Sequence, residues 1–332
     1  MLRKIADQKA LLFIMLCILS GCEQKLPIMQ QPEKNIILPP DNFIGLVRLI
    51  DHPGNDKYPE ASPDGRLVVY SAKKGKTSDI FYFNPFSKRI NVVQITRHIA
   101  EDNDPTWSAD GKYIYFTSAR LKTLSIWKTK IKGGRGLNQI TLRENVDDFD
   151  PSLSPDGKKL VFTSRNPRNK NFFGSQKTSD PTMWVASTEG YRVVQIGTGN
   201  NPKWSPNGKK IIFHAKTGDN YDIWTINSDG TNLTQLTTDS ADDKDPAWSP
   251  DGTMVIFSSN REGTFKTRKN FDLWAIDLES TGITQLTFDP ADDGGPFWSK
   301  DGTVYFHSNR GTKDNTYDIF SGKPIIDWNK KK

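Results

Sequence analysis

One short motif recurs six times in this chain of 332 residues, and its spacing restricts the folds that the chain can adopt. In the copy at residues 242–261, an Asp-rich stretch and a proline precede Trp-Ser-Pro-Asp-Gly and a run rich in Val, Ile and Phe. Pro presets φ, Asp hydrogen-bonds its own backbone and Gly accepts a positive φ, so Pro-Asp-Gly predicts a tight turn. Because apolar residues lie on both sides of the turn, the motif predicts a β-hairpin.

The six copies align on a proline at intervals of 44 to 51 residues, and every copy has Ser three places later and Gly six places later. The aligned prolines are Pro59, Pro105, Pro151, Pro202, Pro246 and Pro296. Every copy predicts a third strand with an aromatic residue at a fixed position, and the first five copies predict a fourth strand that ends in a Gln-Leu-Thr-like triplet. Such a period with strand composition is typical of a propeller with one four-stranded blade per repeat.

The Asp-Pro-x-Trp-Ser-Pro-Asp-Gly pattern, the Asp-Ile-Trp third strand and the Gln-Leu-Thr fourth strand resemble the TolB-like, WD40-like (PD40) propeller repeats. The resemblance covers roughly residues 43–322, which is nearly all of the chain after its N-terminal segment. It implies an all-β fold, a six-bladed β-propeller. It says little about function, because propellers host many unrelated tasks.

Residues 43–50 predict a strand that has no hairpin of its own. Ile50 stands nine residues before Pro59, the distance that separates the Gln-Leu-Thr threonines from the prolines that follow them. The last repeat, by contrast, leaves the pattern after its third strand. We therefore expect the N-terminal strand to complete the blade that begins at Pro296 and to close the ring.

The first 22 residues predict a lipoprotein signal peptide. Three basic residues precede an apolar run at residues 10–19, which is shorter than a membrane-spanning helix requires. Leu-Ser-Gly-Cys22 matches the bacterial lipobox, and this implies cleavage before Cys22 and lipidation of that cysteine; ordinary secretion is the alternative. Residues 23–42, rich in Pro and Gln, predict an extended tether. We expect a lipid-anchored domain on the periplasmic or extracytoplasmic side of a bacterial cell envelope.

The charge of the chain does not favour nucleic acid as a partner. Removal of the signal peptide leaves 42 basic against 38 acidic residues, a net charge of +4, without a basic stripe. Residues 323–332 read as a basic, solvated tail. Cys17 leaves with the signal peptide, so the mature domain has no disulfide. We expect a monomer without a cofactor, because the sequence has no Gly-rich phosphate loop and no paired Cys/His spacing.

Aspartates cluster in the loops that lead into the first strands, and we expect these loops to share a face with the loops between second and third strands. Seven of them are expected to form an acidic ring at the channel mouth: Asp102, Asp104, Asp148, Asp150, Asp243, Asp245 and Asp293. The ring predicts either a site for a cation or a basic partner group, or local turn capping and pairing with the Arg residues that follow the second strands. Whether the channel takes a metal ion stays open, since Ca²⁺ needs six to eight converging oxygens.

Two long loops on the same expected face carry basic residues together with exposed-looking aromatics. They are residues 166–180, with Phe172 and Phe173, and residues 262–270, with Phe265. Phe on a long polar loop predicts a partner contact, or else a ring that folds back onto the blade. With the acidic ring, these loops predict docking of a protein or peptide on this face, while the Pro-Asp-Gly turn face is expected to be inert.

Signals for an enzyme are few. His214 and His307 occupy equivalent repeat positions, so they are either catalytic or metal-binding residues or satisfied polar residues at strand ends. No G-x-S-x-G motif occurs in the sequence, and the fixed register of the tryptophans predicts interblade core. The sequence therefore favours a TolB-like propeller that binds protein without catalysis. The alternative is a carbohydrate-active or hydrolytic propeller enzyme that uses channel His and Asp residues.

Overall fold

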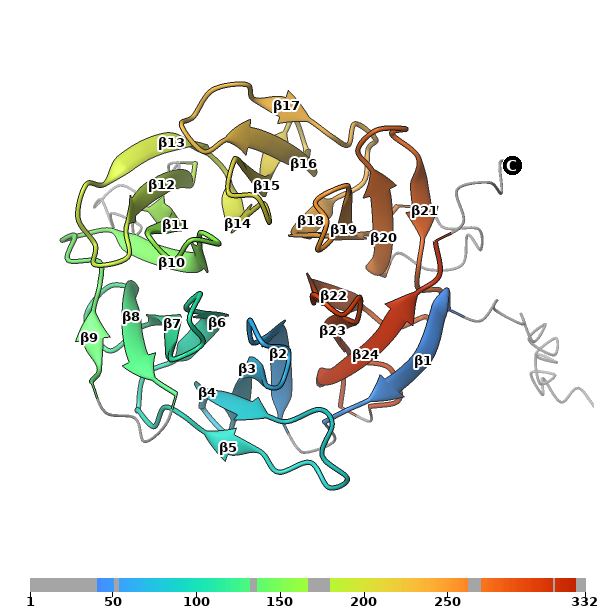
Figure 1. Cartoon of the computed structure of the whole chain (residues 1–332), viewed down its shortest axis with the longest axis horizontal. Helices are drawn as coiled ribbons and strands as arrows, with labels where there is room; N and C mark the ends of the chain where they lie inside the picture. The colour runs from blue at the N-terminus through green and yellow to red at the C-terminus, as the bar shows by residue number, and fades with distance from the viewer. Residues whose placement is uncertain are drawn as a thin grey trace, which may run out of the picture. The chain divides into compact units, whose positions relative to one another are not determined.

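The computed structural model describes residues 41–50, 54–131, 136–166, 180–261, 270–312 and 314–326. All 24 elements in these ranges are β-strands, and the same ranges contain no helix long and apolar enough to cross a membrane. The strands form six antiparallel four-stranded sheets, which are arranged as blades around a central axis (Figure 1). The predicted all-β, six-bladed propeller is confirmed.

Five blades take their four strands in chain order from the axis outward (Figure 1). Blade 1 contains β2 (Asn55–Ala61), β3 (Val68–Lys74), β4 (Thr77–Phe83) and β5 (Val93–Gln94). Blade 2 contains β6 (Asp102–Trp107), β7 (Tyr113–Ser118), β8 (Ser125–Lys130) and β9 (Asn138–Gln139). Blade 3 contains β10 (Asp147–Leu153), β11 (Lys159–Arg165), β12 (Thr182–Ser187) and β13 (Val194–Thr198). Blade 4 contains β14 (Asn200–Trp204), β15 (Lys210–Thr217), β16 (Asn220–Asn227) and β17 (Thr234–Gln235). Blade 5 contains β18 (Asp243–Trp248), β19 (Met254–Ser259), β20 (Asp272–Asp277) and β21 (Ile283–Gln285).

Blade 6 combines the two ends of the propeller. Its strands are β22 (Asp293–Trp298), β23 (Val304–Ser308), β24 (Asp318–Pro324) and, on the outside, β1 (Phe43–Arg48). The blue β1 lies beside the red β24 in Figure 1, and the two pair antiparallel from Phe43 opposite Pro324 to Arg48 opposite Phe320. The predicted closure by the N-terminal strand is therefore confirmed.

The Ser-Pro-Asp-Gly turn between the first and second strands owes its shape to local hydrogen bonds. In blade 5, Ser249 Oγ donates to Asp251 Oδ1 at 2.6 Å and accepts the N–H of Met254 at 2.9 Å. Gly252 has a φ of 74°, which favours glycine. The same Ser-to-Asp bond recurs in the other blades, with Asn207 in place of Asp in blade 4. The repeated motif thus fixes the hairpin beside the axis.

The Gln-Leu-Thr triplet ties the short outer strand to the third strand. In blade 5, Gln285 Nε2 and Thr287 Oγ1 donate to the two oxygens of Asp272 at 3.0 and 3.3 Å. Thr287 Oγ1 also accepts the N–H of Leu273 at 2.9 Å. Equivalent bonds hold the triplets of blades 1 and 4. An outer strand of two or three residues is stable because these side-chain bonds supplement its few backbone bonds.

The tryptophans of the first strands lie in the interblade core, as their repeat register predicts. Trp107 and Trp248 are 4% and 7% exposed, and they pack among buried aliphatic and aromatic side chains. Their Nε1 atoms donate to the main-chain carbonyls of Glu60 and Lys203 in the preceding blades, at 3.0 and 3.2 Å. Each ring therefore joins two adjacent blades by apolar contact and by a hydrogen bond.

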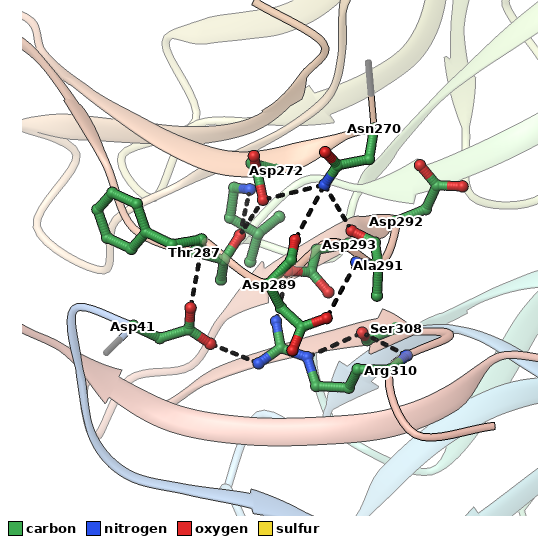
Figure 2. A network of polar contacts seen from close by, with 12 residues as sticks. Asp41, Asn270, Asp272, Thr287, Asp289, Ala291, Asp292, Asp293, Ser308 and Arg310 are labelled. Atoms are coloured by element: carbon green, nitrogen blue, oxygen red, sulfur yellow. Dashed lines mark hydrogen bonds and ion pairs between the residues drawn. The ribbon is translucent and has the colours of Figure 1, made fainter. Parts of the chain in front are cut away.

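Arg310 ties the segment before β1 to blades 5 and 6 (Figure 2). Its guanidinium forms ion pairs with Asp41 and Asp293, and its Nε donates to Ser308 Oγ at 3.0 Å. Asp41 also accepts the N–H of Phe288, just after β21, at 2.7 Å. The last residues of the predicted tether thus belong to the fold and brace the closure of the ring.

Replacement of Arg310 by Met tests this brace. Asp41 and Asp293 would stay largely shielded from solvent but would lose the cation that they share. Removal of one partner of a buried ion pair costs about 3–5 kcal/mol of folding free energy. Chemical denaturation at neutral pH measures the loss. Arg66→Met is the matched control, since that side chain is 82% exposed in a turn and its replacement should change stability by less than about 0.5 kcal/mol. Equal stability of the two variants would contradict the brace.

Candidate functional site

The structure separates the seven predicted ring aspartates into two groups. The first group lies three places before the aligned prolines, is at most 1% exposed and forms ion pairs at 2.5 to 3.5 Å. The pairs are Asp102 with Arg120, Asp148 with Arg143, Asp243 with Arg261 and Asp293 with Arg310. The guanidiniums also lie over aromatic rings, as Arg120 does over Trp127 at 4.8 Å. These four aspartates are buried in ion pairs and do not line the central cavity described below, which is the structural alternative that the sequence left open.

The Arg–Asp pairing expected from the sequence is confirmed in three blades. Arg120, Arg261 and Arg310 follow their second strands and pair within their own blade. In blade 3, Arg143 from the preceding loop takes this place, and Arg165 lies over the ring of Phe149 at 5.1 Å. The repeat therefore uses one buried charge pair as a structural unit.

The second group, Asp104, Asp150 and Asp245, faces the central channel. These aspartates stand directly before the aligned prolines, where every first strand has a register shift. The six residues at this position of the repeat all have φ between 49° and 54°; they are Tyr58, Asp104, Asp150, Asn201, Asp245 and Gly295. Asp, Asn and Gly tolerate the left-handed region better than other residues, and a bulge redirects the side chain at its position. Asp104, Asp150 and Asp245 thus line the channel together.

A cavity of about 570 Å³ follows the first strands of all six blades. Its lining includes the bulge residues and, one place after the aligned prolines, Glu60, Thr106, Ser152, Lys203, Ala247 and Phe297. It continues to the turns, at Pro63, Pro155, Pro206, Pro250 and Lys300. The turn face, which the sequence predicts to be inert toward partners, therefore borders the cavity, and its inertness stays a prediction. The volume lies within the range of small-ligand pockets.

Four carboxylates and two lysines line this cavity: Glu60, Asp104, Asp150, Asp245, Lys203 and, at the turn end, Lys300. Burial raises the pKa of Asp150 to about 8, and the charges of Asp104 and Asp245 add to the effect while Lys203 opposes it. Burial also raises the pKa values of Glu60 and Asp104, again against the charge of Lys203. Of these groups, the Asp150 carboxyl therefore stays partly protonated near neutral pH.

Hydrogen bonds fix the orientation of these groups. Asp150 Oδ2 accepts the N–H of Asn201 at 3.2 Å, and Asn201 Nδ2 donates to Asp245 Oδ1 at 3.0 Å. On the other side, Glu60 Oε1 accepts the hydroxyl of Thr106 at 2.9 Å and the N–H of Trp107 at 3.0 Å. The charged lining is thus built on rigid strands rather than on mobile loops.

The two histidines at equivalent positions serve the neighbouring blade. His214 Nδ1 accepts the N–H of Asp245 at 3.3 Å, and His307 Nδ1 accepts the N–H of Tyr58 at 3.5 Å. Burial lowers the pKa of His214 to about 4 and that of His307 to about 3, so both imidazoles are neutral at pH 7. Each histidine supports the bulge of the next blade, which is the structural alternative that the sequence left open.

No three His, Cys, Asp or Glu side chains in the described parts of the chain are placed to hold one metal ion together. His214 lines the cavity beside Asp245, but its Nδ1 is occupied by the main-chain N–H. The open question of a metal in the channel therefore gains no support from the arrangement of these side chains. Phe172, Phe173, Phe265 and Cys22 lie outside the described residues, so the predictions for them stay predictions.

Sequence reasoning missed Glu60 and Lys203. Both occupy the position one place after the aligned proline, which differs in every repeat, whereas the structural positions of the repeat stay nearly constant. This variation of the side chain at a fixed repeat position was the signal in the sequence that could have identified the two residues as part of a site. A side chain that changes from blade to blade while its backbone position stays the same is not required by the repeat itself.

Asp150→Asn tests the electrostatics of the cavity. The folded pKa of Asp150, about 8, lies above the unfolded value near 3.9, so the folded state binds the proton more tightly. Asp150 therefore reduces stability progressively as pH rises from about 4 to 8. Between pH 5.5 and 8.5, Asp150→Asn should lose less stability than the wild type, by on the order of 2 kcal/mol after allowance for solvent screening.

Unfolding free energies across this pH range provide the measurement. Glu279→Gln removes an exposed carboxylate outside the cavity and should follow the wild-type profile. Parallel profiles for Asp150→Asn and the wild type would show that Asp150 titrates at an ordinary pKa.

Comparisons with known proteins agree with this architecture. The PD40 family, described as the TolB beta propeller domain, matches residues 46–192 and 185–267. A solved structure assigned as TolB from Agrobacterium tumefaciens is 17% identical with a TM-score of 0.60, covering 83% of this chain and 96% of that one. TolB from Acinetobacter baumannii is 17% identical with a TM-score of 0.55, covering 83% of this chain and 65% of that one. Oligogalacturonate lyase from Vibrio parahaemolyticus is 13% identical with a TM-score of 0.58, covering 86% and 96%.

A search of curated protein sequences gives no significant match. At the identities of the solved structures, the likeness shows the fold alone. The two kinds of neighbour, a TolB and a lyase, share the propeller, so any functional assignment has to come from the cavity of this chain.

Proposed function

This chain belongs to the PD40 family of TolB beta-propeller domains, and we propose that it is a binding module of the bacterial cell envelope that holds a protein or peptide partner at its central channel. The partner approaches along the axis, where six rigid first strands present side chains that differ from blade to blade. The module is held near a membrane by the N-terminal lipid and acts as a monomer.

The observation that carries this proposal is the cavity of about 570 Å³ with its uneven lining. The repeat positions that build the blades, such as the buried Asp–Arg pairs, are alike in most copies. The two positions around the aligned proline vary instead, from Tyr58 and Glu60 in blade 1 to Asn201 and Lys203 in blade 4. A rigid scaffold with a variable, charged concave surface is the usual design of a binding site.

A role without catalysis rests on the state of the channel histidines. General base catalysis needs an imidazole with a pKa near the working pH and a nitrogen open to the substrate. His214 and His307 each accept a main-chain N–H, and burial keeps their pKa values at about 4 and 3. No contact in the described cavity favours the alternative of a carbohydrate-active or hydrolytic enzyme over binding.

The place in the cell envelope rests on the sequence. Residues 1–22 have the length and apolar run of a signal peptide and end in the lipobox that contains Cys22. The part of the predicted tether that precedes Asp41, residues 23–40, is long enough, at about 3 Å per residue when extended, to hold the propeller tens of Å from the membrane.

Cys22→Ala tests the lipid anchor. Without the acceptor cysteine the protein should leave the membrane pellet and enter the soluble or unprocessed fraction, as cell fractionation with immunoblotting would measure. Cys17→Ala, which changes a residue inside the expected signal peptide, is the control and should stay in the pellet. A Cys22→Ala protein that fractionates like the wild type means that something other than a lipid on this cysteine holds it.

Site-specific photo-crosslinking in cells tests the binding surface. A photoreactive residue at Lys300, exposed at the turn end of the cavity, should give discrete adducts with an envelope partner. The control position is Ile283 on the outer strand of blade 5, which is 38% exposed. Adducts at Ile283 but not at Lys300 would place the partner on the perimeter. The channel would then lose its proposed role.

A further inference from the structure

We propose that the cavity is a receptor for a single basic side chain, Arg or Lys, carried on a peptide of the partner that enters from the turn face. The inference rests on the proposed function and specifies the chemistry of the partner. Its basis is the balance of charge in the cavity, the shape of the lining and the contrast with the other aspartates of the repeat.

The cavity has an excess of negative groups. Four carboxyl groups line it, those of Glu60, Asp104, Asp150 and Asp245, while Lys203 lies near three of them. With all four ionised, the four carboxylates together with Lys203 and Lys300 would carry a formal charge of −2. The two lysines therefore reduce the negative potential without balancing it, and a positively charged ligand is the natural complement.

The four buried aspartates three places before the aligned prolines are neutralised by cations of the fold itself. Each of the four pairs with a guanidinium, at 2.5 to 3.5 Å. By contrast, none of the four cavity carboxylates has a described cation within the 4.0 Å of an ion pair. The third-strand aspartates Asp79, Asp222 and Asp272 are bound by Gln and Thr side chains instead. The cavity carboxylates differ from both sets because they border an open cavity, where an external cation can reach them.

The remaining lining fits the stem of a basic side chain. Phe297, Ala247 and the turn prolines Pro155, Pro206 and Pro250 border the same cavity. Lys and Arg have apolar stems that pack on such surfaces, while their charged heads reach polar groups beyond. A small hydrated metal ion would gain nothing from these walls, and the described carboxylates are not placed to converge on one.

Binding of a cation should change the protonation of the cavity. Asp150 faces Asp104, Asp245 and Lys203, and burial among these groups holds its pKa at about 8. A guanidinium or ammonium beside it favours the ionised carboxylate, so binding near pH 7 should release a proton to the solvent. This readout reports on the carboxyl group itself and does not depend on the identity of the natural partner.

Titration calorimetry with defined peptides tests the proposal on the full-length lipoprotein in detergent. The probes are acetyl-Gly-Gly-Arg-Gly-Gly-amide, its Lys analogue and its citrulline analogue, which keeps the shape of Arg without the charge. At least one basic peptide should bind saturably, and citrulline should weaken the binding about tenfold or more. Wild-type binding at pH 7 should release protons, measured in buffers of different ionisation enthalpy, and Asp150→Asn should release fewer.

Three variants distinguish a charge effect from a disturbed fold. Asp104→Asn with Asp150→Asn should weaken binding about tenfold or more, and Glu279→Gln, outside the cavity, should leave it unchanged. Lys203→Met should strengthen binding, because it removes the positive charge that lies near Glu60, Asp104 and Asp150, and a damaged fold would not produce a gain. The proposal is overturned if no basic peptide binds, if citrulline binds equally well or if the double variant keeps its affinity.

The peptide titration tests the basic side chain as ligand, whereas crosslinking at Lys300 tests the binding module, so the two experiments can give different results. A partner crosslinked at Lys300, together with peptides that do not bind, would leave the binding module in place and remove the basic side chain as its ligand. If peptides bind with the expected charge dependence but no partner is crosslinked, the site for a basic side chain is supported and the proposed complex with an envelope partner is rejected.

Discussion

The pairing of β1 with β24 is the constraint on which the rest of the structure depends. It joins the two ends of the propeller in one blade, over a register that runs from Phe43 to Arg48. Arg310 strengthens this joint through Asp41 and Asp293. Because the ring is closed, the six first strands keep a common axis, and the cavity between them keeps a defined shape and charge.

The repeat divides its residues between two tasks. Constant positions build blades, through the Ser-Asp turn bonds, the Gln-Leu-Thr triplets and the buried Asp–Arg pairs. Variable positions stand on either side of the aligned proline, where a bulge directs them toward the axis. Symmetry thus supplies a stable scaffold, and departures from symmetry at these two positions supply the chemistry that we propose for binding.

Much of the fold could be predicted from the sequence, because the repeat fixes strand number, blade order and closure together. The site could be predicted only in part, since Asp102 and Asp104 are two residues apart and a regular strand would place both on one face. The left-handed conformation of Asp104 separates them, so that Asp102 meets Arg120 inside the blade while Asp104 faces the cavity. Alternation alone cannot foresee a bulge. Glu60 and Lys203 were not identified from the sequence for another reason. Each is the charged residue of a single repeat copy, so it belongs to no recurring motif.

The unfolding of a chain that lacks residues 43–50 tests the central claim most directly. Without this strand, β24 would present an unpaired edge, and the core residues that pack on Phe43 would lose their cover. The account predicts a loss of several kcal/mol in the free energy of unfolding, from missing strand pairing and apolar burial, together with self-association through the open edge. A truncated protein that melts at the parent temperature as a monomer would contradict it.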